Sequence, residues 1–368
     1  MTTTVTAAVI REIDAPFQFE ELTLDEPRLD EVLVKIVAVG LCHTDLAVQH
    51  ADLAQEMPIV VGHEGAGVVE KVGSAVTDVA VGDRVVISFS ACGDCANCLS
   101  GRRAYCLKFG ESNFSGCRLD GSTTLRDERG DEVHGSFFGQ SSFATHVVAA
   151  ARDVVVLPED APLELVGPLG CGIQTGAGAV LNSLAVPAGA TVAVFGAGSV
   201  GLASVMGAKV AGATTIIAID VMEERLELAK ELGATHTLNG RDEDISDRIL
   251  QISGGGVPYA VDTTGVAPVI TTLLKVTALG ARIALLGVSK PGATIELGLI
   301  TPGGKTFFGV YQGDSTPKLF IPEMLALHAA GRFPFDRLVT RYRFDQLDDA
   351  IADTHSGAAV KAVLTMPQ

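Results

Sequence analysis

Basic residues are scarce in this sequence. Lys and Arg together account for 27 of its 368 residues, against 44 Asp and Glu, and the formal net charge is −17. A surface with this excess of negative charge repels phosphate backbones, so the composition argues against nucleic acid as a partner. A small anionic ligand is still compatible with it, because the positive end of a single helix can outweigh a distant net charge.

A long apolar run is also missing. Residues 165–208 carry no charge, but Gly, Pro, Gln, Asn and Ser interrupt them before about 18 predominantly apolar residues follow one another. The N-terminal MTTTVTAAVIREID contains Arg, Glu and Asp before such a run develops, so we expect no secretory signal peptide. There is no repeat and no low-complexity tract. These features predict a cytoplasmic protein without a membrane partner, and 368 residues favour two domains over one.

Four of the seven cysteines lie close together in ACGDCANCLSGRRAYC. The spacing C-x2-C-x2-C-x7-C brings four thiolates within reach of one ion, and an all-sulfur tetrahedral shell is typical of a structural zinc site. In a secreted chain the same run would favour disulfides. Because we expect no secretion, we predict that one zinc ion is bound by Cys92, Cys95, Cys98 and Cys106.

Two further cysteines and a histidine form a second, dispersed set. Cys42 lies in GLCHTD, His63 in GHEGAG and Cys171 in GPLGCGIQTG. Two sulfurs and one nitrogen leave the fourth position of a zinc ion open, which is the pattern of a catalytic site. On spacing alone, each of the three is also compatible with an ordinary buried residue. Cys117 is left over, and the default interpretation for it is an idle thiol.

The pattern of apolar residues changes along the chain. Before Cys171, short β-branched runs such as EVLVKIVAVG, GAGVVEKVGS and VGDRVVIS predict a small barrel or sandwich, and we interpret residues 107–140 as a long ordered loop with short strands. Farther on, ATVAVFGAGSVGLASVMGAKVAGATTIIAID predicts a βαβ unit. Helices MEERLELAKELG and VAPVITTLLKVTALG, with strands near YAVDTTG and ARIALLGV, continue a doubly wound parallel sheet. We therefore predict an α/β protein with one domain of residues 1–172 and 312–368 and another of residues 173–311.

A glycine turn follows the first strand of that sheet. Gly196, Gly198 and Gly201 form G-x-G-x-x-G between the strand TVAVF and a helix, a turn that lets a pyrophosphate approach the backbone and the helix N-terminus. Asp220 ends the next strand, where a carboxylate can bind the ribose hydroxyls of a dinucleotide. A carboxylate there repels a 2′-phosphate, so NAD is favoured over NADP, although Arg225 could also reach the ribose.

Together, these motifs resemble the zinc-dependent medium-chain alcohol dehydrogenases over essentially the whole chain. The resemblance rests on GLCHTD, GHEGAG, VGDRVV, the four-cysteine run, GCGIQTGAGAV, GAGSVG and the closing KAVLTM. It implies a Rossmann domain that binds NAD, a β-rich GroES-like catalytic domain with a structural zinc lobe, and two zinc ions per subunit. The 107–140 segment resembles the loop of dimeric relatives, which implies a homodimer, with a tetramer as the alternative.

The resemblance also implies roles for single residues. Two cysteines and a histidine are the established ligands of the catalytic zinc in alcohol dehydrogenases, so Cys42, His63 and Cys171 would bind it, with the carboxylates of Asp45 and Glu64 behind them. The other implied positions are Thr44 at the substrate oxygen, Lys361 near the coenzyme phosphates, the backbone around Val288 and Val310 at the nicotinamide, and Thr175, Ser199 and Val200 as further coenzyme contacts.

Two positions depart from the family pattern. Ala47 stands where many relatives have a histidine that completes the proton relay, so we expect the proton to pass from Thr44 and the coenzyme ribose to water or to His50. His43 stands where an arginine often meets the pyrophosphate. Because a histidine is only partly charged near neutral pH, we expect weaker retention of NADH.

Within the family, GPLGCGIQTGAGAVLN together with His43 and Ala47 most resembles bacterial aryl-alcohol (benzyl alcohol) dehydrogenases. This implies reversible oxidation of a primary, aromatic alcohol to its aldehyde by hydride transfer to NAD. Aliphatic or allylic alcohols and S-(hydroxymethyl)glutathione stay open as alternative substrates. Aromatic residues are available for an apolar pocket, unless they belong to the core: Phe89, Phe109, Phe114 and Phe138.

Two other classes of protein share parts of this pattern. A zinc-ribbon interaction module would use only the four-cysteine run, and the acidic composition and the complete coenzyme domain argue against it. A zinc-free quinone reductase would share the fold but lack Cys42, Cys171 and the four-cysteine run.

Overall fold

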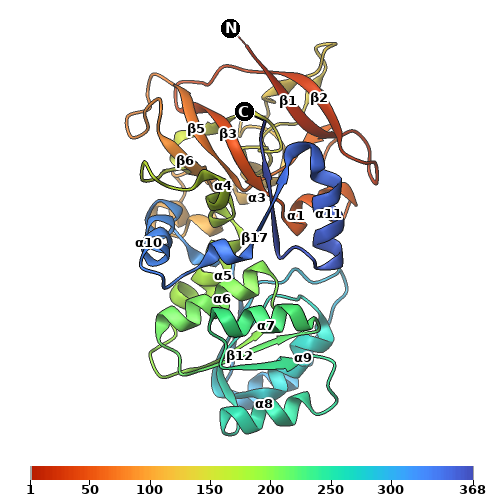
Figure 1. The fold of residues 1–368 in the computed structure, drawn as a ribbon, viewed down its shortest axis with the longest axis vertical. Coiled ribbons are helices and arrows are strands. Elements are labelled where there is room, and N and C mark those ends of the chain that lie inside the picture. The colour runs from red at the N-terminus through yellow and green to blue at the C-terminus, as the bar shows by residue number, and fades with distance from the viewer. Residues whose placement is uncertain (1, 368) are drawn as a thin grey trace. The chain divides into compact units, whose positions relative to one another are not determined.

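The computed structural model describes residues 2–367, which divide into two compact units. The first unit contains the described residues up to Cys171, Thr316–Pro322 and the residues from Leu338 onward. The second contains Gly172–Ser315 and Glu323–Arg337. The arrangement of elements within each unit can be followed in Figure 1.

Some residues lie in a different unit from the one that the sequence predicted. Gly172, residues 312–315 and Glu323–Arg337 fall within the predicted first domain but group with the second unit. For the longest of these segments the contacts give the reason: Arg337 forms an ion pair with Glu231, and Arg332 donates a hydrogen bond to the carbonyl of Val210. The unit boundary therefore lies inside helix α10 (Pro317–Ala329).

The first unit is built from two sheets. Its strands are β1 (Thr3–Ile10), β2 (Gln18–Leu24), β3 (Glu31–Gly40), β4 (Ile59–Val60), β5 (Gly65–Val72), β6 (Arg84–Ile87), β7 (Leu125–Arg126), β8 (Glu132–Val133), β9 (His146–Ala150), β10 (Val154–Val156), β17 (Val339–Arg343) and β18 (Lys361–Thr365). One sheet has the order β4-β1-β2-β7-β8, and the other has β10-β6-β5-β3-β18-β17, with β9 also paired to β3. Short helices lie between these strands along the chain: α1 (His43–Gln49), α2 (Ala96–Leu99), α3 (Phe109–Phe114), α4 (Leu163–Val166) and α11 (Leu347–Ser356).

β-Branched residues explain why this unit forms sheets. Nearly every residue of β3, EVLVKIVAVG, is buried, and its Val34 and Ile36 share one apolar core with residues of β1 such as Val5 and Val9. Such side chains pack well on a pleated, buried surface. The 107–140 segment contains the predicted short strands, β7 and β8, and additionally the helix α3.

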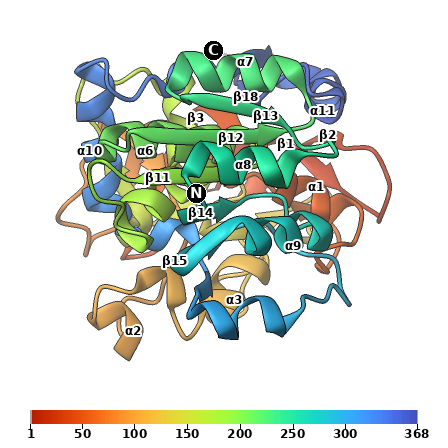
Figure 2. The same cartoon turned by 90° about the horizontal axis from the view of Figure 1, so that it is seen from below.

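The second unit contains a six-stranded parallel sheet with the order β13-β12-β11-β14-β15-β16. In Figure 2, β12, β11, β14 and β15 can be seen to follow one another in this order. Its strands are β11 (Thr191–Phe195), β12 (Thr215–Asp220), β13 (His236–Asn239), β14 (Val257–Asp262), β15 (Thr277–Leu285) and β16 (Thr306–Gly309). Its helices are α5 (Gly172–Gly178), α6 (Ser199–Ala211), α7 (Glu223–Leu232), α8 (Ile245–Ser253) and α9 (Ala267–Val276). Because the sheet is parallel, all its strands end at the same edge, where doubly wound folds bind their ligands.

The helix predicted over VAPVITTLLKVTALG is shorter in the structure. It ends at Val276, and Thr277 already has the extended backbone of β15. Gly280 adopts a φ of +71°, which is outside the helical range. Of the helices within residues 2–367, none has the length and apolarity that crossing a membrane would require.

Candidate active site

The dispersed metal ligands predicted from the sequence converge in the first unit. The side-chain donor atoms that all lie within 4.8 Å of one another belong to Cys42, His63, Glu64 and Cys171. Strand pairing brings the first three together, because β3 runs antiparallel to β5 with Val39 opposite Gly65. The residues just after β3 and just before β5 therefore meet at one end of the sheet.

Glycines allow Cys171 to approach these strands. Cys171 follows the 3-10 turn Gly167–Gly170, and a Cβ atom added to Gly167 would lie 2.2 Å from the carbonyl oxygen of Glu64. A Cβ atom on Gly170 would lie 2.4 Å from the backbone of β6. A larger residue at either position would push the turn, and with it the Cys171 thiol, away from the other ligands.

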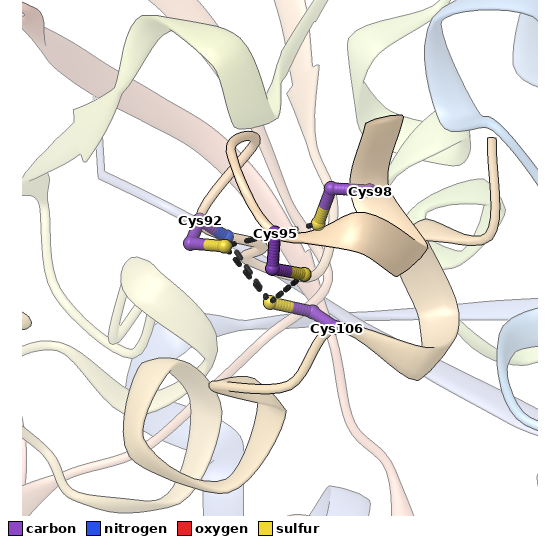
Figure 3. Close-up of side chains that lie close together, drawn as sticks. All are labelled: Cys92, Cys95, Cys98 and Cys106. Atoms are coloured by element: carbon purple, nitrogen blue, oxygen red, sulfur yellow. Dashed lines mark hydrogen bonds between the residues drawn. The ribbon is translucent and has the colours of Figure 1, made fainter. Parts of the chain in front are cut away.

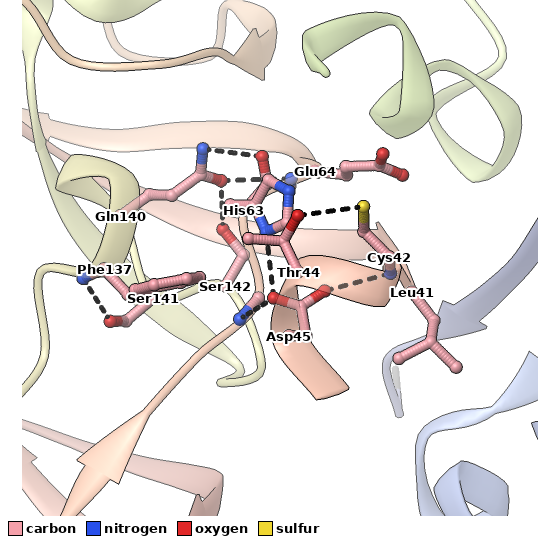
Figure 4. A network of polar contacts seen from close by, with 12 residues as sticks. Leu41, Cys42, Thr44, Asp45, His63, Glu64, Phe137, Gln140, Ser141 and Ser142 are labelled. Carbon is pink, nitrogen blue, oxygen red and sulfur yellow. Dashed lines mark hydrogen bonds and ion pairs between the residues drawn. The ribbon is translucent and has the colours of Figure 1, made fainter. Parts of the chain in front are cut away.

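The carboxylate of Asp45 holds two of the ligands. Its Oδ1 lies 2.8 Å from Nδ1 of His63 and also accepts a hydrogen bond from the backbone N–H of Gly62. Its Oδ2 accepts one from the backbone N–H of Cys42 at 3.0 Å. The side chains of Asp45 and His63 are fully buried. Figure 4 shows this arrangement, in which the carboxylate orients the imidazole and places the start of α1.

The donor atoms fit a zinc ion. Nε2 of His63 is buried and makes no hydrogen bond within residues 2–367, which is the state of a nitrogen that is oriented for a metal. A hydrogen bond from the Cys171 thiol lowers the pKa of Cys42 well below its ordinary value, and the same interaction raises the pKa of Cys171. Metal binding would remove the remaining proton, leaving two thiolates and one imidazole with a fourth position open.

A buried ion pair lies beside the ligands. Nζ of Lys361 donates to both carboxylate oxygens of Glu64 at 3.0 Å and to the carbonyl of Leu41 at 3.1 Å, and both charged residues are almost completely buried. Burial opposes the charge of Lys361, but Glu64 outweighs it and raises the lysine pKa. Burial raises the pKa of Glu64.

Lys361, which the resemblance implied to lie near the coenzyme phosphates, uses its three N–H groups for Glu64 and Leu41. A cation at residue 361 therefore stabilises the carboxylate behind the metal ligands. Gly40 makes room for that carboxylate, because a Cβ atom on it would lie 2.0 Å from Oε2 of Glu64.

The predicted relay residues lie along α1. The Cys42 thiol lies 3.6 Å from Oγ1 of Thr44, so the threonine hydroxyl is next to the ligand cluster. Its neighbour His43 is the first residue of the helix and is exposed. His50 caps the opposite end, about 9 Å farther along the axis, where its Nδ1 lies 2.8 Å from Asp14 at the surface. A relay from Thr44 to His50 would therefore need the predicted coenzyme ribose, or water, to span this separation.

The four aromatic residues suggested for a pocket form one continuous cluster. The Phe138 ring stacks on the imidazole of His63, with centroids 4.4 Å apart. From Phe138 the cluster continues to Phe114 at 5.3 Å, then to Phe109 and Phe89. Phe138 thus contacts the three-ligand site through His63, whereas Phe109 packs against the four-cysteine lobe.

The second predicted metal site is also assembled. The Sγ atoms of Cys92, Cys95, Cys98 and Cys106 lie within 4.8 Å of one another, and Figure 3 shows their side chains converging around α2. Within the described residues none of the seven cysteines forms a disulfide, so the alternative of a disulfide-bonded cluster is not supported. Four sulfurs without an open position fit a structural zinc ion.

Backbone N–H groups prepare this cluster for a cation. The N–H of Leu107 donates to Sγ of Cys95 at 3.4 Å and lowers the pKa of that thiol to about 6. Burial raises the pKa of Cys92 to about 12. An ion pair of 2.7 Å joins Arg103 to the buried Asp153 and so ties the lobe to the residues directly before β10.

The glycine turn of the second unit has the predicted geometry. Gly196 follows β11 with a φ of +92°, and Gly198 is the N-cap of α6, whose first residues are Ser199 and Val200. A Cβ atom on Gly201 would lie 1.8 Å from the carbonyl oxygen of Gly196, so only glycine allows this close contact of helix and turn. The N–H groups of the first helical turn are left for a phosphate.

Asp220 ends β12 beside that turn. A cavity of about 140 Å³ is lined by Gly196, Ile219, Asp220 and Thr264, among others. The carboxylate of Asp220 accepts backbone N–H hydrogen bonds from Ala197, Val221 and Met222, which hold it at the rim of this cavity. Arg225, one turn into α7, is half-buried, and its Nε makes no hydrogen bond in the described part of the chain.

The other suggested coenzyme positions are spread over the second unit. Val310 directly follows β16, and its N–H donates to the carbonyl of Leu285 at the end of β15. Val288 lies a few residues beyond β15 and is 89% exposed. Thr175 belongs to α5. Val310 and Val288 thus follow the carboxyl ends of their strands, at the same edge of the sheet as the glycine turn.

Sequence reasoning missed a group that supports the turn. Asp262, at the end of β14, is buried and accepts hydrogen bonds from Thr264 and Gly265. Thr263 donates to the carbonyl of Phe195, and its Oγ1 would lie 2.3 Å from a Cβ atom on Gly196. The signal in the sequence was DTTG directly after a predicted strand, at the same edge as Asp220.

The two donor sets and the dinucleotide turn define a metal-dependent dehydrogenase. Residues 28–159 match the alcohol dehydrogenase GroES-like domain family, and residues 199–329 match the zinc-binding dehydrogenase family. The chain therefore belongs to the zinc-dependent medium-chain alcohol dehydrogenases, as the motifs predicted. Membership confirms the predicted Rossmann and GroES-like fold and the dependence on zinc and a nicotinamide cofactor, and it argues against the zinc-ribbon and quinone-reductase alternatives.

Individual relatives are similar over nearly their full length. The geraniol dehydrogenase of Castellaniella defragrans is 45% identical over 362 residues, which cover 97% of this chain and 96% of the relative. An alcohol dehydrogenase zinc-binding domain protein from Burkholderia ambifaria has 49% identity and a TM-score of 0.98, with both chains covered completely. The benzyl alcohol dehydrogenase of Acinetobacter calcoaceticus has 42% identity and a TM-score of 0.95, covering 99% of this chain and 100% of the other.

Proposed function

We propose that this alcohol dehydrogenase oxidises primary alcohols whose carbinol carbon carries an aromatic ring, with NAD as the hydride acceptor. The alcohol would lose a hydride from carbon and a proton from oxygen, giving the aldehyde, NADH and a proton. The single observation that supports the chemistry best is the convergence of Cys42, His63 and Cys171, with Nε2 of the histidine left for a metal. Similarity to a benzyl alcohol dehydrogenase supports the aromatic substrate.

Each residue of the site has its own part in the proposed reaction. A bound zinc ion would supply a Lewis acid that lowers the pKa of the substrate hydroxyl. Thr44, whose Oγ1 lies 3.6 Å from the Cys42 thiol, would accept the hydrogen bond of that hydroxyl and pass its proton outward. Asp45 holds the imidazole of His63, and Lys361 neutralises Glu64, so that the ligands keep their positions during turnover. Because Ala47 carries no donor and His50 is at the far end of α1, we propose that the proton leaves to water.

Rates with a panel of alcohols test the substrate proposal. With NAD in excess, we expect kcat/KM for benzyl alcohol to exceed that for ethanol by about 100-fold, because an apolar pocket gains roughly 1–3 kcal/mol from each well-placed apolar group. Geraniol should follow benzyl alcohol. A preference for geraniol by more than about tenfold would instead support the allylic alternative, which the Castellaniella relative favours. S-(hydroxymethyl)glutathione as the best substrate would contradict both.

The preference for NAD is tested at Asp220. Replacing it with asparagine removes a charged acceptor for the ribose hydroxyls and the repulsion of a 2′-phosphate. We expect kcat/KM for NAD to fall about tenfold, because hydrogen bonds to charged groups contribute about 1.5–3 kcal/mol. The ratio of kcat/KM with NAD to kcat/KM with NADP should fall by more than this, because the repulsion of the 2′-phosphate is lost as well. Glu227→Gln is the matched control: it removes one negative charge from α7, where Glu227 is exposed and pairs with Lys230. An unchanged cofactor ratio in Asp220→Asn would refute the assignment.

We further propose a homodimer, with a tetramer as the alternative. The sheet of the second unit ends at β16, and within residues 2–367 no strand pairs with its outer edge. Leu297 and Leu279 are exposed in the same unit. An edge strand near exposed apolar side chains is suited to pairing with a second copy. The mass in solution, measured by sedimentation, should be that of two or four chains, and a monomer would contradict this.

A further inference from the structure

The imidazole of His63 is constrained at one edge by Asp45. A hydrogen bond at Nδ1 fixes the position of the ring but leaves it free to tilt about the line that joins the two groups. Nε2 lies on the other side of the ring, so a tilt would move it away from the two cysteines. A contact on the face of the ring is needed to prevent this.

Phe138 supplies that contact. Its ring stacks on the imidazole with an interplanar angle of 23° and a centroid distance of 4.4 Å. Phe137 meets the same imidazole edge-on at 5.7 Å and 82°. Behind Phe138, the ring of Phe114 lies in a T-shaped contact at 5.3 Å. Phe138 is 4% exposed, so it is held between the histidine and the aromatic cluster.

The backbone of Phe138 is in an unfavourable conformation. Its φ is +51° and its ψ is 32°, the left-handed region, which non-glycine residues rarely adopt. Such conformations persist when surrounding contacts fix them, and they are often found at functional sites. The strain indicates that the position of this ring is determined by its surroundings and not by local backbone preference.

The 136–142 loop is fastened to the strands that carry His63. Gln140 is fully buried; its Nε2 donates to the carbonyl of His63 at 3.0 Å, and its Oε1 accepts from the N–H of Gly65 at 3.1 Å. Ser141 donates to the carbonyl of Val60 at 2.6 Å and accepts from the N–H of Phe137. Figure 4 shows Gln140 bridging the backbone on both sides of Glu64, the residue directly after the histidine.

We propose that Phe138 is a positioning residue that fixes the ring plane of His63, and with it the direction of Nε2 toward the metal. The hydrogen bonds of Gln140 and Ser141 hold the loop, and the loop holds the phenyl ring against the imidazole. This inference rests on the proposed three-ligand metal site. It assigns to the 136–142 loop a part in metal retention that the ligands themselves do not explain.

The test compares metal release from zinc-loaded protein to an excess of a chelating dye. For Phe138→Leu we expect one of two metal ions to leave about tenfold faster than in the unchanged protein, the size of effect seen when a group that orients a ligand is lost. The second ion, in the four-cysteine lobe, should leave at an unchanged rate. Cobalt substituted at the three-ligand site should show a shifted visible absorption spectrum, which a loss of overall stability alone would not produce.

Two variants serve as controls. Phe138→Tyr keeps a stacking ring and should restore the release rate to within about a factor of two. Phe114→Leu disturbs the same aromatic cluster without touching His63 and should leave the cobalt spectrum unchanged. If Phe138→Leu does not accumulate as folded protein, Phe138→Met is measured in its place.

The outcomes distinguish an error in the positioning role of Phe138 from an error in the three-ligand metal site. If the unchanged protein binds two metal ions and the Phe138 variant releases both at unchanged rates, the positioning role is wrong and the metal site stands. An equal effect of Phe114→Leu would also overturn the positioning role. If the unchanged protein binds only the ion of the four-cysteine lobe, the proposed three-ligand site itself is wrong.

Discussion

Replacing Cys171 with alanine is expected to abolish alcohol oxidation and to lower the metal content from two ions per chain to one. The variant keeps one thiol, one imidazole and the Glu64 carboxylate, whose two oxygens already accept hydrogen bonds from Lys361, so the set of two sulfurs and one nitrogen that would hold zinc is lost. Without the Lewis acid the substrate hydroxyl keeps its ordinary pKa, and several kcal/mol of stabilisation of the transition state are lost. We therefore expect kcat/KM to fall by at least about 10³-fold.

Cys117 provides the matched control. It is the one cysteine outside the two clusters of donor atoms found in residues 2–367. Cys117→Ala should therefore keep both metal ions and full activity. Zinc analysis of the purified variants, together with steady-state rates, gives the comparison. Retention of two zinc ions by Cys171→Ala would show that the three residues do not share a metal.

Replacing Lys361 with methionine should destabilise the first unit severely. The change leaves the Glu64 carboxylate buried without its cation, and breaking a buried ion pair in this way costs about 3–5 kcal/mol. The loss should appear as a lower free energy of unfolding in denaturant titrations of the metal-loaded protein. Adding Glu64→Gln to the variant should recover part of the loss, because the stranded charge is then removed.

A surface pair shows what the same change costs without burial. Lys71 donates to Glu26 with nearly the same geometry, but both side chains are substantially exposed. Lys71→Met should lower the free energy of unfolding by only a small fraction of the loss in Lys361→Met, because water screens an exposed ion pair. Equal losses for Lys361→Met and Lys71→Met would mean that the buried ion pair contributes no more to the free energy of unfolding than the exposed one.

Much of the fold followed from local sequence patterns. The strands β3 and β5 and the helix α7 lie where β-branched runs and apolar periodicity predicted them. The predicted helix after residue 266 continued past Val276, because apolar periodicity does not reveal that Gly280 adopts a left-handed φ. Residues 323–337 were assigned to the wrong unit, because the ion pair of Arg337 with Glu231 joins residues 106 positions apart.

The candidate site divides in the same way. The donor types at Cys42, His63 and Cys171 were readable from their motifs, and β3–β5 pairing then brought two of them together. The ion pair of Lys361 with Glu64 was missed because the two residues lie 297 positions apart in the chain. Phe138 was noted as an aromatic residue, but its stacking on His63 depends on a strained backbone that no sequence pattern indicates.

The sequence by itself determined which chemistry is available: four clustered thiols for one ion, two sulfurs and an imidazole for another, and a glycine turn followed by Asp220 for a dinucleotide. These are properties of side-chain type and short spacing, which hold before any folding. The tertiary structure alone decided which charges and rings support that chemistry, namely Lys361 against Glu64 and Phe138 against His63. The physical reason is that these partners lie far apart in the sequence. They meet only when strand register and close packing bring both into the same buried volume.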